Sequence, residues 1–210
     1  MLAADTLCSY GSMAKFMGAR RLVEVDKVLL GAGGELSDFQ SIQDQLEAHA
    51  LSEECTSGLY DKHRSNAREI WNYLGAFMYK RRNDMNPIWN DVVVAGKDSS
   101  GKMFLGSVDK IGTKLEEDIL ATGFGSYFVI SLLREKWRND MQEGEARALL
   151  EDCMRILFYR DGRASNRIQI AKVSQDSGDV LISDPYELET QWDIGTLTTP
   201  VTDLDGDGGW

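Results

Sequence analysis

Three consecutive valines, Val92–Val94, limit the architectures that are open to this chain of 210 residues. They lie in the segment Trp89–Gly96, which follows Pro87 and precedes the polar turn Asp98–Gly101, so its boundaries are typical of a strand. Successive side chains of a strand point to opposite faces of its sheet, and an unbroken apolar run therefore predicts burial on both faces. We expect other layers of the protein to cover both sides of this sheet.

The rest of the chain supplies strands and paired helices for those layers. Alternating or apolar runs predict further strands at Met1–Asp5, Arg21–Leu30, Met103–Asp109, Gly112–Leu115, Arg167–Ser174 and Asp179–Ser183. Apolar residues spaced three and four apart predict a helix that opens at a Ser37 N-cap, and others from about Ser65 to Arg82, over Gly123–Trp137 and over Glu143–Phe158. Hairpin-linked strands pair antiparallel, and paired helices pack on sheet faces. The order predicts an α+β fold of two antiparallel sheets face to face, with helices outside.

Charge divides the chain into a balanced part and an acidic end. The net charge is −11, and nine carboxylates but no lysine or arginine follow Lys172. From Pro185 onward the sequence has no strong helix or strand period. We therefore predict one domain over residues 1–184 and an extended acidic arm over residues 185–210.

Composition excludes several classes of function. The negative charge argues against a nucleic-acid-binding protein, whose binding surface would be basic. Nothing approaches the about 18 consecutive apolar residues of a membrane span, and the first ten residues do not resemble a signal peptide. Three widely spaced cysteines, Cys8, Cys55 and Cys153, favour reduced thiols inside the cell over a disulfide framework.

Few residues suggest a metal site or a hydrolytic triad. His49 and His63 lie at a helix end and in a loop, where solvated histidines are the more common case. The run Asp203–Gly208 matches the first half of a calcium-binding EF-hand loop, but the chain ends before the glutamate that such a loop needs. We expect neither a metal nor a cofactor, and we interpret this run as an acidic tail.

Five segments, in this order and spacing, resemble the beta subunits of the 20S proteasome. They are Leu2–Asp5, Gly31–Gln40, Arg81–Asn90, Ala121–Ser126 and Cys153–Asp161. The Met85–Asn90 run, the turn Ser9–Ser12 and the run Thr190–Ile194 are similar to one non-catalytic subtype, at the seventh position of the beta ring. The resemblance implies the four-layer αββα sandwich of N-terminal-nucleophile hydrolases. The resemblance places the family's first strand, which carries the nucleophile, ahead of Met1. We therefore expect either that the mature start lies upstream or that the chain is truncated.

The resemblance also identifies positions of the family's active site, and about half of them are altered. Active members use an N-terminal threonine, with an aspartate and a lysine that set the electrostatics. Asp5 matches that aspartate, but Arg21 stands at the lysine position. Phe124 replaces a serine at the glycine turn, and Ala164 replaces a later serine, although Asp161 matches the aspartate before it. The resemblance thus implies a subunit that is not an enzyme by itself.

The implied function is that of a non-catalytic structural subunit, in the cytoplasm and nucleus, within stacked seven-membered rings of alpha and beta subunits. We expect no nucleic acid or membrane among its partners. The arm is expected to reach the opposite beta ring through interface residues Tyr186, Leu188, Trp192 and Ile194. Two alternatives are an active threonine endopeptidase with a further N-terminal segment, and a free-standing acidic binding domain with a calcium-sensitive tail.

Overall fold

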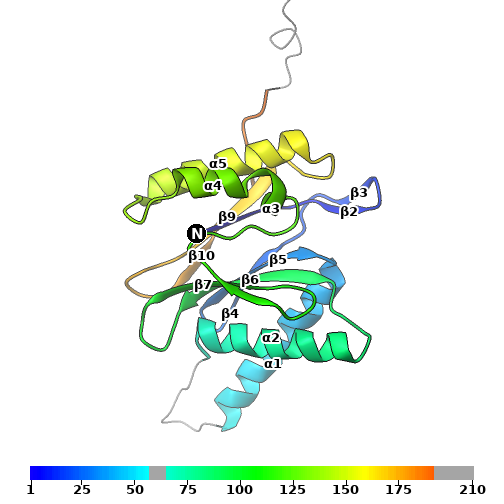
Figure 1. Cartoon of the computed structure of the whole chain (residues 1–210), viewed down its shortest axis with the longest axis vertical. Coiled ribbons are helices and arrows are strands. Elements are labelled where there is room, and N and C mark those ends of the chain that lie inside the picture. The colour runs from blue at the N-terminus through cyan, green and yellow to red at the C-terminus, as the bar shows by residue number, and fades with distance from the viewer. Residues whose placement is uncertain (57–64, 192–210) are drawn as a thin grey trace, which may run out of the picture.

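A computed structural model describes residues 1–56 and 65–191 and has an α+β architecture with two main sheets (Figure 1). The larger sheet has five antiparallel strands in the order β4-β5-β6-β7-β8. Its strands are β4 (Leu22–Val25), β5 (Val28–Gly34), β6 (Asn90–Lys97), β7 (Met103–Val108) and β8 (Lys114–Glu116). Val92 and Val94 are fully buried on the face that packs against two helices, and Val93 is buried on the opposite face. The expected cover on both faces of this strand is therefore confirmed.

The second sheet is built around β9 (Arg167–Val173). Three strands pair antiparallel with β9: β1 (Leu2–Asp5), β10 (Val180–Ile182) and β11 (Tyr186–Glu187). The pairing places Asp5 opposite Ile168, so the end of the first strand lies beside the chain that follows the last long helix. A separate two-stranded ribbon is formed by β2 (Cys8–Tyr10) and β3 (Met13–Phe16).

Helices lie on the outer side of each sheet (Figure 1). The larger sheet is covered by α1 (Leu36–Thr56) and α2 (Ala67–Asn83), and the second sheet by α3 (Gly125–Phe128), α4 (Ile130–Lys136) and α5 (Glu143–Arg160). The main core lies between α1, α2 and the larger sheet, with Phe39, Ile42, Leu74 and Met78 almost fully buried. A smaller apolar cluster, which includes Leu29, Ala95 and Ala171, joins the two sheets.

Three predicted elements need correction. The predicted single strand Arg21–Leu30 is two strands, because the chain reverses at Asp26 and Lys27, which have φ of 51° and 66°. The predicted helix Gly123–Trp137 is broken at Val129, whose φ of −121° leaves the helical range. Ser37 does not cap a helix, since α1 already begins at Leu36 and the Ser37 hydroxyl donates to Glu35 Oε1 at 3.1 Å.

The ribbon β2–β3 and strand β11 are further differences from the sequence-based expectation. The segment Ser9–Ser12 was expected only as a turn, and the structure extends that turn into a hairpin around Gly11. Tyr186 and Glu187 were expected within an arm without regular structure, but they pair with β9. Among the described residues, no helix could cross a membrane and no cluster of metal-binding side chains is found.

Candidate functional site

Asp5 is the centre of a small polar site where β1 ends. The next residues leave the sheet: Thr6 N–H donates to Arg167 O at 3.0 Å, and the buried Thr6 hydroxyl lies 3.0 Å from Met17 O. The Asp5 side chain points inward and is buried, so its carboxylate needs partners inside the protein. These partners come from two segments that are distant from Asp5 in sequence.

Arg21 supplies the cation of this site. Its Nη1 lies 2.7 Å from Asp5 Oδ1, and its Nη2 donates to the carbonyl oxygen of Leu7. The Arg21 side chain is 30% exposed, so it enters the site from the surface. The guanidinium thus neutralises Asp5 and also fixes the chain directly after β1.

The loop after α5 supplies the other partner. Ser165 N–H donates to Asp5 Oδ2 at 3.2 Å, and Ser165 Oγ accepts from Arg167 N–H at 3.0 Å. Asp161 ends α5, and its Oδ1 accepts the N–H of Arg163 at 2.9 Å. Ala164, which was expected beside the site, is half-buried and carries no polar side chain, whereas its neighbour Ser165 is buried and contacts Asp5.

Burial dominates the electrostatics of Asp5. Loss of hydration raises the pKa of the Asp5 carboxyl, whereas the Arg21 charge and the amides of Ser165 and Leu7 act to lower it. The charge of Asp161 adds a further upward contribution to this pKa, which shows that the two carboxylates sense each other. The structure therefore places Asp5 and Arg21 in direct contact, whereas Asp161 makes no hydrogen bond to either among the described residues. A role for these positions in an active site stays a prediction.

Phe124 lies on the surface at the start of α3. Its ring is 53% exposed and stacks on Phe128 with 6.0 Å between centroids. The hydroxyl of nearby Ser126 donates to Gly123 O at 2.6 Å, so it serves the turn itself. At position 124 the chain therefore presents an exposed aromatic ring and no hydroxyl group.

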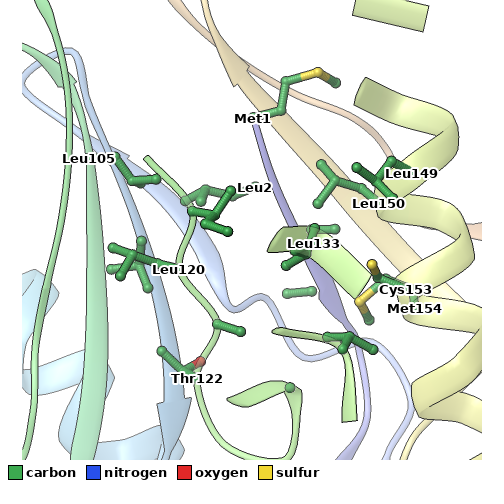
Figure 2. A pocket seen from close by; sticks show the side chains of 18 of the residues that line it. Met1, Leu2, Leu105, Leu120, Thr122, Leu133, Leu149, Leu150, Cys153 and Met154 are labelled. Carbon is green, nitrogen blue, oxygen red and sulfur yellow. The ribbon is translucent and has the colours of Figure 1, made fainter. Parts of the chain in front are cut away.

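Two cavities lie near these residues. A small polar cavity of about 100 Å³ is lined by Arg21 together with Cys8, Ser9, Gly34 and Asn90. A larger apolar cavity of about 270 Å³ lies between the sheets and α5. Figure 2 shows its side chains, among them Leu2, Leu105, Leu120, Leu133, Leu149, Leu150 and Cys153. Burial raises the pKa of the Cys153 thiol to about 11, so this thiol stays protonated near neutral pH.

The residues expected at an interface fall into two pairs. Tyr186 and Leu188 contact this chain's own domain: the Tyr186 hydroxyl donates to Glu151 at 2.6 Å, and Leu188 is only 5% exposed. Trp192 and Ile194 lie outside the described residues. An interface role for these four residues stays a prediction, and for Tyr186 and Leu188 it has to be reconciled with contacts inside the chain.

The main contact that the sequence-based analysis missed is the one from Ser165 to Asp5. It joins residues 160 positions apart, and neither hydrophobic periodicity nor a local motif reports such a contact. The only local signal is that Ser165 is a small polar residue two positions before a predicted strand. The buried hydroxyl of Thr6 was missed for the same reason.

Comparison with known proteins gives a consistent result over nearly the whole chain. The sequence matches the proteasome subunit family over residues 1–173. It is 39% identical over 208 residues to proteasome subunit beta type-4 of Arabidopsis thaliana, covering 98% of this chain and 82% of that protein. It is 41% identical over 200 residues to proteasome subunit beta type-4 of Dictyostelium discoideum, covering 93% and 74%. Proteasome subunit beta type-7 of Saccharomyces cerevisiae is 34% identical over 206 residues, with coverage of 92% and 76%.

Proposed function

This chain belongs to the proteasome subunit family, as a beta subunit, and we propose that it is a non-catalytic structural subunit of the 20S core particle. The family is one of threonine peptidases that act in protein degradation. The subtype that the sequence motifs resemble is beta type-4, and two relatives carry this name. We assign this chain to the same subtype.

The ion pair between Arg21 and Asp5 is the observation that carries the proposal. In the active members that this chain resembles, a lysine occupies the Arg21 position and assists proton transfer at an N-terminal threonine. A guanidinium keeps its charge at every physiological pH, so it cannot exchange a proton as an ammonium group can. Here it is also engaged with Asp5 and with the Leu7 carbonyl. Arg21 therefore cannot take over the proton transfer that the lysine assists in active members.

Two further departures support the same conclusion. Phe124 and Ala164 stand where the active members carry serines, and neither side chain can donate a hydrogen bond. Asp5 and Asp161 are retained, and Asp5 now serves the structure by joining β1, Arg21 and the loop after α5. We infer that the former reaction centre has become a structural one.

The alternative is a catalytically active threonine endopeptidase with an N-terminal segment beyond this sequence. The retained Asp5 and Asp161 are the observations that favour it. Arg21 and Phe124 argue against it, because they remove a proton carrier and a hydroxyl from the same region. The non-catalytic role explains all four residues together.

The proposal includes the setting in which the subunit acts. We infer that the two sheets and their outer helices form the four-layer αββα sandwich of N-terminal-nucleophile hydrolases. Its partners would be other alpha and beta subunits in stacked seven-membered rings, where this chain takes the seventh beta position. The C-terminal arm would reach the opposite beta ring, and the particle would act in the cytoplasm and nucleus without a cofactor.

The test uses intact particles purified under native conditions. They are treated with a covalent probe directed at N-terminal threonines, and every labelled subunit is identified by mass spectrometry. We expect this chain to co-purify with the large particle and to stay unlabelled, while active beta subunits of the same particle provide the positive control. Labelling of this chain would establish the active alternative. Elution of the chain apart from the particle would show that it is not one of its subunits.

A further inference from the structure

An aromatic and basic patch lies where α2 ends and the chain turns toward β6 (Figure 1). We define it by six residues with exposed side chains from two segments: Tyr79, Arg82, Met85, Trp89, Lys110 and Ile111. Met85 and Trp89 lie in the run Met85–Asn90, which marked the subtype but has no part in the site around Asp5. The patch therefore has no role in the function proposed so far.

Contacts within the chain hold the two segments of the patch together. The loop from Asp109 to Thr113 crosses Tyr79 so closely that a Cβ on Gly112 would lie 2.7 Å from Tyr79 Cβ. Lys110 Nζ lies 4.7 Å from the centre of the Trp89 ring, and Trp89 N–H donates to Asp38 Oδ2 at 2.8 Å. These contacts hold the loop that carries Lys110 and Ile111 against Tyr79 and Trp89.

Its apolar members are unusually exposed for their size. Met85 is 89% exposed and Trp89 is 58% exposed, and Tyr79 and Ile111 are also open to solvent. Met85 has a φ of 56°, a backbone conformation that residues with a β-carbon rarely adopt. Met85 follows the C-cap of α2, and the Asn86 N–H bonds back to Arg81 O, so this is a left-handed helix-ending turn that presents the Met85 side chain to solvent.

The cations of the patch are positioned by aromatic rings, and they form no ion pairs among the described residues. Arg82 Cζ lies 5.6 Å from the Tyr79 ring centre, which orders the guanidinium but leaves its N–H groups available. Nearby carboxylates accept backbone amides: Asp109 accepts two amides of its own loop, and the half-buried Asp91 accepts the backbone N–H of Lys110 and is attracted by the Lys110 charge. Exposed Asp84, at the end of α2, reduces the positive charge in part.

Arg81, which precedes Arg82 in α2, carries a buried donor without a partner in the described part of the chain. Arg81 Nε is buried and finds no acceptor among the described residues. The Arg81 carbonyl accepts the N–H of Asn86 at 3.0 Å, so the same residue also supports the turn that presents Met85. Ordered cations beside exposed rings are complementary to a segment that carries both carboxylates and an apolar side chain.

We infer that the aromatic and basic patch docks an acidic polypeptide segment of a neighbouring subunit in the same particle. This inference rests on the proposed function, because the occupant is another member of the assembly. Carboxylates of the segment would meet Arg82 and Lys110, and one of its apolar side chains would cover Met85 and Trp89. Lys110 and Arg82 would then determine which segment binds, and the rings would supply most of the buried area.

The test places a photoreactive benzophenone amino acid at position 85, whose exposure allows the change without repacking the core. Native particles that contain this variant are irradiated, and the cross-linked peptide is identified by mass spectrometry. We expect a cross-link to an acidic stretch of another subunit. Adding Lys110→Glu should lower the cross-link yield by about tenfold or more, because like charges across an interface cost more than one tenfold step in affinity.

Lys102→Glu is the matched control, since Lys102 is an exposed lysine in a different hairpin and should leave the yield unchanged. Native electrophoresis and thermal unfolding confirm that each variant folds and enters the particle. If the particle assembles but no cross-link forms, the docking inference fails and the proposed function stands. The same holds if Lys110→Glu and Lys102→Glu change the cross-link yield equally. If the chain enters no particle at all, the proposed function fails and the inference fails with it.

Discussion

Arg21 pairs with Asp5 at the end of β1, and under the proposed function this ion pair has a structural role. Its guanidinium holds a buried carboxylate that would otherwise be unpaired, so the fold now depends on it. We predict that Arg21→Ala lowers the free energy of unfolding by about 2–3 kcal/mol, less than the about 3–5 kcal/mol for a fully buried pair, because Arg21 is partly exposed. Chemical denaturation of the two purified chains measures this difference.

A second substitution separates the charge from the packing. In the Arg21→Ala background, Asp5→Asn removes the unpaired charge but keeps a side chain of similar size. More than half of the lost stability should return if the uncompensated Asp5 charge causes the loss. Absence of any recovery would mean that Arg21 acts through its contacts with the chain after β1 instead.

The raised pKa of Asp5 also predicts the sign of a pH effect. Burial favours the protonated carboxyl, so the folded state holds this proton more tightly than the unfolded state, in which the pKa is near 3.8. The resulting stabilisation is complete below pH 3.8 and is lost as the pH rises through the higher folded-state pKa. The stability of the wild type relative to Asp5→Asn should therefore fall with rising pH across that window. Denaturation curves of both proteins at several pH values test this, and a rise would contradict it.

At the scale of elements, the sequence predicts what depends on local pattern. The valine strand, the helices α2 and α5 and the hairpin β6–β7 follow from periodicity and turn residues, and the structure contains all of them. The β4–β5 reversal was missed because its two turn residues, Asp26 and Lys27, include no glycine, although both adopt positive φ. The site was predicted only in part, because the link from Ser165 to Asp5 depends on how β1 pairs with β9.

Two glycines with similar backbone conformations allow a controlled test of close packing between elements. Gly112 and Gly101 have φ of 85° and 79°, but a Cβ would meet Tyr79 at Gly112 and open space at Gly101. Gly101→Ala should cost about 1 kcal/mol from backbone strain alone. Gly112→Ala should cost about 1–3 kcal/mol more, because it also forces the loop away from α2. Thermal unfolding measures both losses of stability. Equal losses for Gly101→Ala and Gly112→Ala would show that the loop at Gly112 moves away from α2 without cost.

A stripe on α5 holds the segment that leads into the arm. The Tyr186 hydroxyl donates to Glu151, Arg155 Nε donates to Glu189 O at 3.2 Å, and Gln191 N–H donates to Tyr159 Oη at 2.7 Å. Residues 151, 155 and 159 recur every four positions, so they share one face of the helix. The path of the chain through Gln191 is therefore set by α5.

Tyr159→Phe tests this stripe without changing the ring. The substitution removes the acceptor of the Gln191 amide, and a lost hydrogen bond of about 1 kcal/mol corresponds to roughly fivefold faster amide exchange. Hydrogen exchange of peptides that contain Gln191 measures the change. Tyr127→Phe is the control, because Tyr127 is 79% exposed on α3 and should leave that exchange rate unaltered.

At the scale of the whole molecule, the chain combines a nearly balanced part through Lys172 with a strongly acidic end. Five of the nine negative residues in this end lie between Lys172 and Gln191, and four lie beyond Gln191. The apolar residues beyond Gln191 include Trp192, Ile194 and Leu197, which a purely solvated tail would not need. The domain through Gln191 and the segment after it can therefore be tested separately.

Truncation after Gln191 separates the arm from the fold and tests its proposed role between the beta rings. Leu188 and the α5 stripe remain, so the domain should keep its stability, whereas half-particles should join more slowly or weakly. If Trp192 anchors the contact, loss of a hot spot of about 2 kcal/mol weakens association by roughly 30-fold. Truncation after Thr199 is the matched control, because it removes the acidic glycine-rich end and keeps Trp192. Native electrophoresis over time follows joining, and equal rates with equally salt-resistant particles for all three chains would exclude a role for the arm.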